Sequence, residues 1–127
     1  MHEMGLCEGV LAVVRDVSDD GPVSRVRLRV GRLQGVVPDV FEFCWHLVAQ
    51  DTGAAEARVE LTDVPVRVRC RSCGVEGEPE GTTVACPGCG APAVDLLAGD
   101  ELTVEEVELA GGEVRRNPGL QDAVEVR

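Results

Sequence analysis

The chain has 127 residues and a mass of 13.5 kDa, which suits one domain with a small insert. Apolar residues make up 44% and aromatic residues only 2%, so we expect a core built mainly from valine, leucine and alanine. The formal net charge is −11 and all twelve basic residues are arginine, which argues against nucleic acid or anionic membrane as a partner. We find no apolar run of membrane-spanning length and no signal peptide, and therefore expect a cytoplasmic protein.

The first predicted element is a helix that runs from near the start to about Val17. Its apolar residues recur at steps of three and four: Leu6, Val10, Val13, Val14 and Val17. The turn residues of SDDGP end this helix. Residues 23–31 then alternate strictly between apolar residues and Arg25, Arg27 and Arg29, which predicts a half-buried strand.

A second helix is predicted over residues 38–53, because Pro38 suits a first turn and Gly53 a C-terminal cap. Its predicted apolar stripe consists of Val40, Phe43, Cys44, Leu47 and Val48.

Two more strands are expected within residues 57–69 and 100–109. In the second of these the apolar alternation changes phase before Val107, which indicates a β-bulge or a shorter strand. Glu60, Glu105 and Glu106 would face the arginines of the first strand, and opposite charges on neighbouring strands are mildly stabilising. A solvated polar face of the sheet, however, explains most of this charge pattern.

The strongest signal is CRSCGVEGEPEGTTVACPGCG, in which two Cys-x-x-Cys pairs are separated by twelve residues. The pairs are Cys70 with Cys73 and Cys86 with Cys89. Four thiolates in a tetrahedral array select zinc, and a closed four-ligand site is structural. The alternatives are a redox motif or a pair of disulfides. The insert is too small for a core of its own, so we expect zinc to hold it folded, with Arg67, Arg69 and Arg71 offsetting its negative charge.

Two further cysteines stand apart from this cluster. Cys44 is predicted to be a small core residue, and ordinary packing is also the main interpretation of Cys7, with a role beside a bound metal as the alternative. For His46 we expect packing or solvent exposure rather than metal binding.

The start MHE offers a second metal site. The Met1 amine, the His2 amide and the His2 imidazole form two fused chelate rings and occupy three corners of a square, which favours Ni(II) or Cu(II). The fourth ligand must come from elsewhere, and Glu3, Asp39, water and a partner are all candidates. A histidine at position two usually carries no metal, so chelation chemistry alone does not decide the question.

Three segments together resemble one family: MHEMGLC, RVRLRVGRLQGVVPDVFEF, and the cysteine pairs followed by GDEL. Over roughly residues 1–110 the chain is similar to the HypA/HybF family, nickel metallochaperones of [NiFe]-hydrogenase maturation. The resemblance implies nickel at the amino terminus through His2 and structural zinc at the four clustered cysteines. It also implies a nickel-handling GTPase as partner and insertion of nickel into the precursor of the hydrogenase large subunit.

The expected fold is α+β, with two helices packed on a small three-stranded mixed sheet and a zinc ribbon inserted between the second and third strands. Residues 1–66 and 97–111 would form the nickel-binding domain, residues 67–96 the ribbon and residues 112–127 a mobile C-terminal tail. No catalytic triad, phosphate loop or dinucleotide motif is present, so we expect a carrier and not an enzyme. The alternative function is a zinc-ribbon adaptor that binds protein or nucleic acid without carrying nickel.

Overall fold

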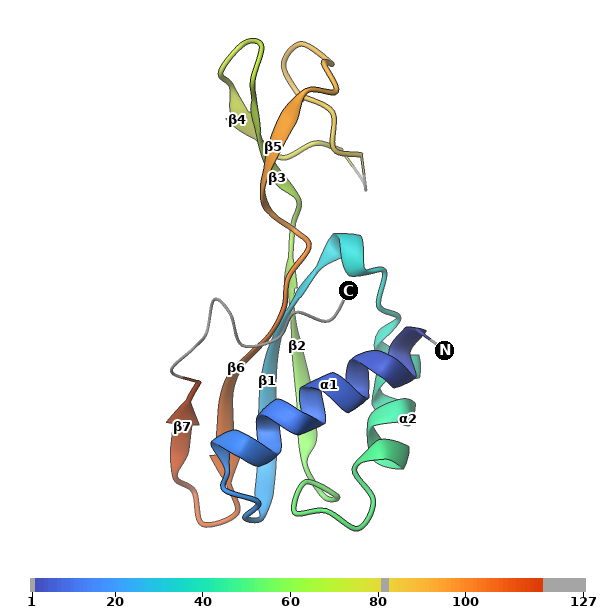
Figure 1. The fold of residues 1–127 in the computed structure, drawn as a ribbon, viewed down its shortest axis with the longest axis vertical. Coiled ribbons are helices and arrows are strands. Elements are labelled where there is room, and N and C mark those ends of the chain that lie inside the picture. Colours follow the sequence, from blue (N-terminus) through green and yellow to red (C-terminus); the bar gives the residue numbers. More distant parts are fainter. Residues whose placement is uncertain (1, 81–82, 118–127) are drawn as a thin grey trace.

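Two helices and two sheets make up the fold (Figure 1). The computed structural model describes residues 2–80 and 83–117, with His2 described by its backbone alone. The helices are α1 (His2–Val17) and α2 (Pro38–Val48), and a short 3-10 helix, η1 (Arg32–Gln34), precedes α2. The larger sheet has the strand order β2 (Arg58–Val64), β1 (Val23–Gly31), β6 (Leu102–Leu109), β7 (Val114–Arg116). The smaller sheet has the order β4 (Glu76–Gly77), β3 (Arg67–Cys70), β5 (Val94–Ala98).

The expected α+β architecture is confirmed, and the larger sheet has one strand more than expected. Strand β1 pairs in parallel with β2 and antiparallel with β6, so this sheet is mixed. The smaller sheet lies between β2 and β6 in the sequence and projects from one end of the larger sheet (Figure 1). The additional strand β7 pairs with β6 and falls inside the segment from residue 112 that was expected to be a mobile tail. Residues 118–127 of that segment lie outside the described residues.

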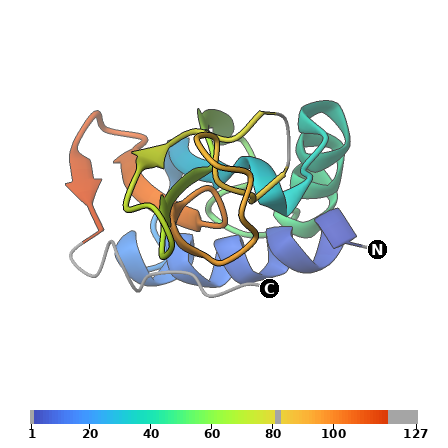
Figure 2. The ribbon, with the colours of Figure 1, turned by 90° about the horizontal axis from the view of Figure 1, so that it is seen from above.

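The core lies between the helices and the larger sheet. Helix α1 crosses one face of this sheet, and α2 lies beside α1 (Figure 2). The core includes Leu6, Cys7, Val10 and Val14 of α1, Phe41, Cys44 and Trp45 of α2, and Val26, Leu28, Val104 and Val107 of the sheet. Valine and leucine dominate it, as the composition predicted. None of the helices in the described ranges has the length and apolar character needed to cross a membrane.

The buried face of α2 overlaps the predicted stripe only in part. Of the predicted residues, Cys44 is buried and Val48 is partly buried against the core, whereas Val40, Phe43 and Leu47 are exposed. Phe41 and Trp45, outside the predicted stripe, are buried. The prediction was partly wrong because the apolar residues of this helix cover a broad arc and leave only the side of Asp39, Glu42 and His46 polar, so spacing alone allows more than one buried face. The face that carries both Trp45 and Phe41 removes more apolar area from water, which makes it the favoured one. The helix also ends at Val48 rather than near Gly53.

The strand predicted within residues 57–69 divides into β2 and β3, which belong to different sheets. Pro65 stands at the break, where its missing N–H prevents a continuous ladder. The predicted irregularity in the last strand is a β-bulge, because Arg27 lies opposite Glu106 but Leu28 lies opposite Val104. Glu105 is the extra residue between them, and this explains the slip of phase in the sequence.

Two arginines of β1, Arg25 and Arg27, form ion pairs on the sheet face away from the helices. Arg25 contacts Glu60 at 3.3 Å, Glu108 at 3.4 Å and Glu106 at 3.7 Å. Arg27 contacts Glu106 at 3.0 Å and Glu60 at 3.5 Å. The predicted pairing is therefore confirmed for Glu60 and Glu106. The third glutamate that pairs with these arginines is Glu108, where the sequence pattern predicted Glu105.

Replacing Arg25 with methionine is expected to lower the free energy of unfolding by about 2 kcal/mol. The side chain of Arg25 is only 14% exposed, and its loss would leave three neighbouring carboxylates without their shared cation. Methionine retains the apolar stem of arginine, so the effect reports the charge. Arg29→Met is the matched control, because Arg29 lies on the same strand and the described residues give it no ion pair. Equal losses in both variants on urea unfolding would contradict this assignment.

The connection between the two sheets is a close crossing of backbones. A Cβ atom on Gly31 would lie 2.2 Å from the carbonyl carbon of Gly99, and one on Gly99 would lie 2.6 Å from Cα of Val66. The N–H of Gly31 donates to the Glu101 carbonyl at 2.7 Å, and the N–H of Leu33 donates to the Gly99 carbonyl at 2.8 Å. Only glycine at 31 and 99 permits this approach.

Gly31→Ala is therefore expected to destabilise the protein by about 2–3 kcal/mol, because the new methyl group meets backbone that cannot move aside. Gly5→Ala is the control. Gly5 lies in α1 with open space around its Cα, so alanine there should raise stability by about 0.5–1 kcal/mol. Thermal unfolding of the two variants measures both effects, and a Gly31→Ala protein as stable as the wild type would contradict the close crossing.

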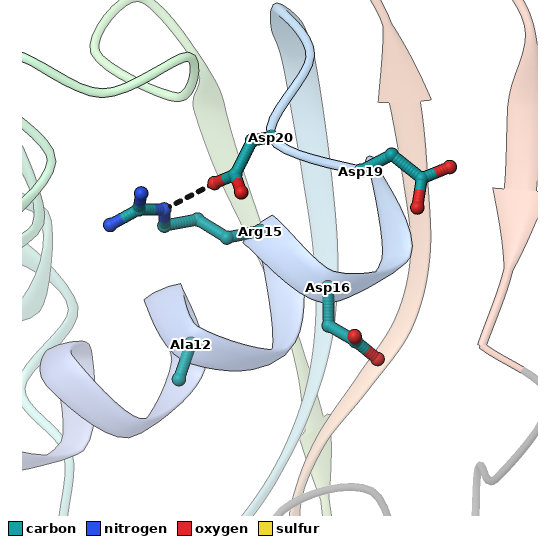
Figure 3. A pocket seen from close by; sticks show the side chains of 5 residues that line it. All are labelled: Ala12, Arg15, Asp16, Asp19 and Asp20. Carbon is teal, nitrogen blue, oxygen red and sulfur yellow. Dashed lines mark hydrogen bonds and ion pairs between the residues drawn. The ribbon is translucent and has the colours of Figure 1, made fainter.

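The turn after α1 fixes the position of β7. Asp19 and Asp20 both have positive φ, at 53° and 59°, which aspartate tolerates better than most residues. Figure 3 shows Arg15 directed towards Asp20, and its Nε lies 2.6 Å from the carboxylate. Asp19 points the other way, and Arg115 of β7 donates both to its carboxylate and to the Val17 carbonyl at 3.1 Å. These bonds hold β7 against the end of α1.

Candidate metal centre

Two matching turns present the four clustered cysteines. In the first turn, the N–H groups of Ser72 and Cys73 each donate to Cys70 Sγ at 3.3 Å. In the second, the N–H groups of Gly88 and Cys89 donate to Cys86 Sγ at 3.2 and 3.3 Å. Each turn thus folds around the sulfur of its own first cysteine.

A glycine directly follows each Cys-x-x-Cys pair, where the tight turn requires a positive φ. Gly74 and Gly90 both have a φ of 78°, in the left-handed region that favours glycine. Their N–H groups donate to the carbonyls of Cys70 and Cys86 at 3.0 and 2.9 Å, which closes the two turns. The donors at Ser72 and Gly88 were not identified from the sequence, although the repeated Cys-x-x-Cys-Gly pattern was a signal that could have predicted them.

The four sulfur atoms come together in one cluster, all within 4.8 Å of one another. Cys70 Sγ lies 3.7 Å from Cys89 Sγ, and Cys73 Sγ lies 3.6 Å from Cys86 Sγ. Four thiolates at a Zn–S distance of about 2.3 Å in a tetrahedron stand about 3.8 Å apart, so the spacing fits zinc. It is too long for a sulfur–sulfur bond, and all four cysteines are free thiols in the structure.

Backbone donors lower the pKa of two of the four thiols in this cluster. The N–H of Cys73 lowers the pKa of the Cys70 thiol to about 6, helped by the N–H of Ser72 and opposed by desolvation. Its counterpart in the second turn, Cys86, also has a lowered pKa, mainly because the N–H of Cys89 donates to it. The N–H of Val75 lowers the pKa of Cys73, but hydrogen bonds with the Cys86, Cys70 and Cys89 sulfurs, together with desolvation, outweigh it and raise this pKa to about 11. A dication held by the four sulfurs would offset the repulsion among neighbouring thiolates and would allow all four thiols to lose their protons.

The arginines beside the first pair take other partners than expected. Arg69 forms an ion pair with Glu76 at 2.9 Å, and Arg67 contacts the same carboxylate group at 3.7 Å. Arg71 pairs with Asp95 at 3.3 Å. Their charge is therefore matched first to carboxylates of the smaller sheet rather than to the sulfurs.

Two of the candidate nickel ligands, Glu3 and Asp39, lie where α1 meets the start of α2. Met1 and the His2 side chain lie outside the described residues, and His2 begins α1. The Glu3 carboxylate accepts a hydrogen bond from the N–H of Val37 at 3.4 Å, directly before Pro38 opens α2. Asp39 is exposed in the first turn of α2. The structure thus brings Glu3 to the end of α2 that carries Asp39, a contact across 34 residues that the sequence did not indicate.

The two remaining cysteines belong to the core. Cys7 and Cys44 are both buried, and the Cys7 thiol donates to the Phe41 carbonyl at 3.5 Å. Burial, with Cys44 and Glu3 adding to it, raises the pKa of Cys7 to about 12, so its thiol stays protonated at neutral pH. This supports ordinary packing and not a ligand role. His46 was expected to be either packed or exposed to solvent, and the structure shows it exposed.

Comparison with known proteins identifies the family of this chain. Residues 1–109 match the family model described as hydrogenase/urease nickel incorporation, metallochaperone, HypA. The chain belongs to the HypA family. A hydrogenase maturation factor HypA from Geobacter metallireducens is 38% identical over 109 residues, covering 86% of this chain and 99% of that protein. One from Nostoc sp. (strain PCC 7120) is 32% identical over 109 residues, covering 86% and 96%.

The fold also resembles solved HypA structures. The solution structure of the Ni metallochaperone HypA from Helicobacter pylori matches with a TM-score of 0.66 and 18% identity. The match covers 86% of this chain and 97% of that one. A second solution structure of a HypA protein matches with a TM-score of 0.63. Identity at this level shows a shared fold, and membership of the HypA family rests on the sequence matches.

Proposed function

We propose that this chain carries Ni(II) at its amino terminus and helps to insert it into the precursor of the hydrogenase large subunit. The observation that supports this most strongly is the HypA family match, which spans residues 1–109 and so includes both candidate metal sites. In this proposal the Met1 amine, the His2 amide and the His2 imidazole bind nickel, and Glu3 or Asp39 is a candidate for the fourth position. The protein acts as a carrier and maturation factor, and not as an enzyme.

The second part of the proposal is a structural Zn(II) at Cys70, Cys73, Cys86 and Cys89. The mutual spacing of the four sulfurs supports it, as do the two turns that direct backbone N–H groups to Cys70 and Cys86. We assign residues 67–96 to this zinc ribbon and residues 1–66 with 97–111 to the nickel-binding domain. A site with four thiolate ligands has no open position, so zinc here would brace the fold while nickel moves elsewhere.

The proposed partners are a nickel-handling GTPase of hydrogenase maturation and the hydrogenase precursor. Nucleic acid and membrane are not proposed as partners, because a net charge of −11 repels both. Calorimetric titration of the native, untagged chain with Ni(II) tests the proposal: one equivalent should bind in addition to the zinc. A chain that binds zinc but no nickel would instead be a zinc-ribbon adaptor.

A further inference from the structure

Helix α2 exposes an apolar stripe that the fold leaves uncovered. Its members are Val37 at the N-cap and Val40, Phe43 and Leu47 in the helix, with exposed fractions of 51%, 38%, 65% and 44%. The three helical members have the spacing i, i+3 and i+7, with which an amphipathic helix enters an apolar groove of another protein. Phe43 is one of only two phenylalanines in the chain, and aromatic side chains are enriched at protein interfaces.

A hollow on the opposite flank of α2 from this stripe provides a second recognition feature, and the exposed acids Asp39 and Glu42 lie between the two. It has a volume of about 260 Å³, lies between α2 and β2, and is lined by Pro38, Asp39, Phe41, Glu42, Val59 and Leu61. The carboxylates of Asp39 and Glu42 stand at this hollow, and the apolar side chains of Val59 and Leu61 line it from β2. An arginine or lysine of a partner fits this chemistry, because its stem packs on apolar atoms while its charged end meets a carboxylate.

From the stripe and the hollow together, we infer that α2 docks a protein partner whose apolar groove is bordered on one side by basic residues. A second copy of this chain does not meet that description. Residues 38–48 contain two acids and no lysine or arginine, so two α2 helices face to face would oppose like charges. The net charge of −11 adds to this repulsion.

The position of the stripe ties it to nickel transfer, and in this respect the inference rests on the proposed function. Val37, the first member of the stripe, donates its N–H to the Glu3 carboxylate at 3.4 Å. A partner seated on α2 therefore lies near Glu3, which follows Met1 and His2 and is itself a candidate for the fourth nickel ligand. The surface is suited to the protein that exchanges nickel with the amino terminus.

The test measures binding of the purified maturation GTPase, the proposed partner, to the native chain by calorimetry. Phe43→Ser should weaken binding at least about thirtyfold, as expected for a central aromatic anchor. Glu42→Gln should weaken it less and make it less sensitive to salt. Val114→Ser is the control, since Val114 is 45% exposed on β7, at the far edge of the sheet from α2, and binding should not change.

Circular dichroism, zinc content and nickel affinity should be the same in Phe43→Ser and the wild type, because Phe43 is exposed and outside both metal sites. Equal GTPase affinity of wild type and Phe43→Ser would overturn the inference. So would self-association that Phe43→Ser alone abolishes, since this would assign the stripe to a second copy. Failure of the proposed function would give a different result: the wild type and His2→Ala would bind nickel with the same affinity.

Discussion

Replacing Cys73 with alanine is expected to remove the bound zinc and to unfold the ribbon while the rest of the protein stays folded. Cys73 Sγ lies 3.6 Å from Cys86 Sγ within the cluster, so its loss leaves three thiolates and an open position. Structural zinc contributes about 10–16 kcal/mol to the folding of small zinc-binding units, and little else holds this one. Among the described residues of 67–96, only Val68, Cys70, Pro79 and Cys86 are buried, and two of these are candidate ligands.

The two parts of the protein can be followed separately in this experiment. The core between the helices and the larger sheet contains none of the described residues of 67–96, and Trp45, the only tryptophan in the sequence, is buried within it. Tryptophan fluorescence should therefore show a folded core in Cys73→Ala, while metal analysis shows less than one equivalent of zinc. Cys44→Ala is the control, because Cys44 is a core residue outside the cluster and its loss should leave the zinc in place. A full equivalent of zinc in Cys73→Ala would contradict the four-cysteine site.

The parts of the structure that depend on local sequence could be predicted. The Cys-x-x-Cys-Gly turns close on themselves, so Gly74 and Gly90 could be assigned positive φ without knowledge of the fold. The alternation of β1 and the bulge at Glu105 are likewise visible as a period of two and its interruption. Such features depend on backbone sterics and on the alternation of buried and exposed residues over a short segment. Both can be inferred from the residue types of that segment alone.

Other parts depend on contacts between distant segments. The buried face of α2 is decided by which side chains α1 and the sheet can accommodate, because the apolar residues of the helix span an arc broad enough for more than one buried face. The contact of Glu3 with Val37 and the crossing of Gly31 with Gly99 join residues 34 and more positions apart. The periodicity of apolar residues within one segment does not indicate contacts between distant segments. Strand β7 has only three residues, too few for a period to show.

Nickel binding is expected to depend on a free amino terminus and on His2. In His2→Ala the imidazole is lost, and a tag without histidine fused to the amino terminus converts the α-amine into an amide. Loss of a partner of a metal ligand already costs about 10- to 100-fold in affinity, so loss of a ligand itself should cost at least about 100-fold. His46→Ala is the matched control, because His46 is the only other histidine and is exposed on α2. A tag at the carboxyl terminus is the control for the fusion, since the family match ends at residue 109.

The affinity for nickel should also fall as the pH is lowered. An α-amine has a reference pKa of about 8 and an imidazole one of about 6.5, so protons compete with the metal at both nitrogens below neutral pH. Calorimetry at several pH values measures this, with mass spectrometry to verify that Met1 is retained. Zinc should stay bound in every variant, because the cysteine cluster lies on the smaller sheet and the turns beside it, apart from α1. If the wild type, His2→Ala and the amino-terminally tagged chain bind nickel equally well, the proposed nickel site is wrong.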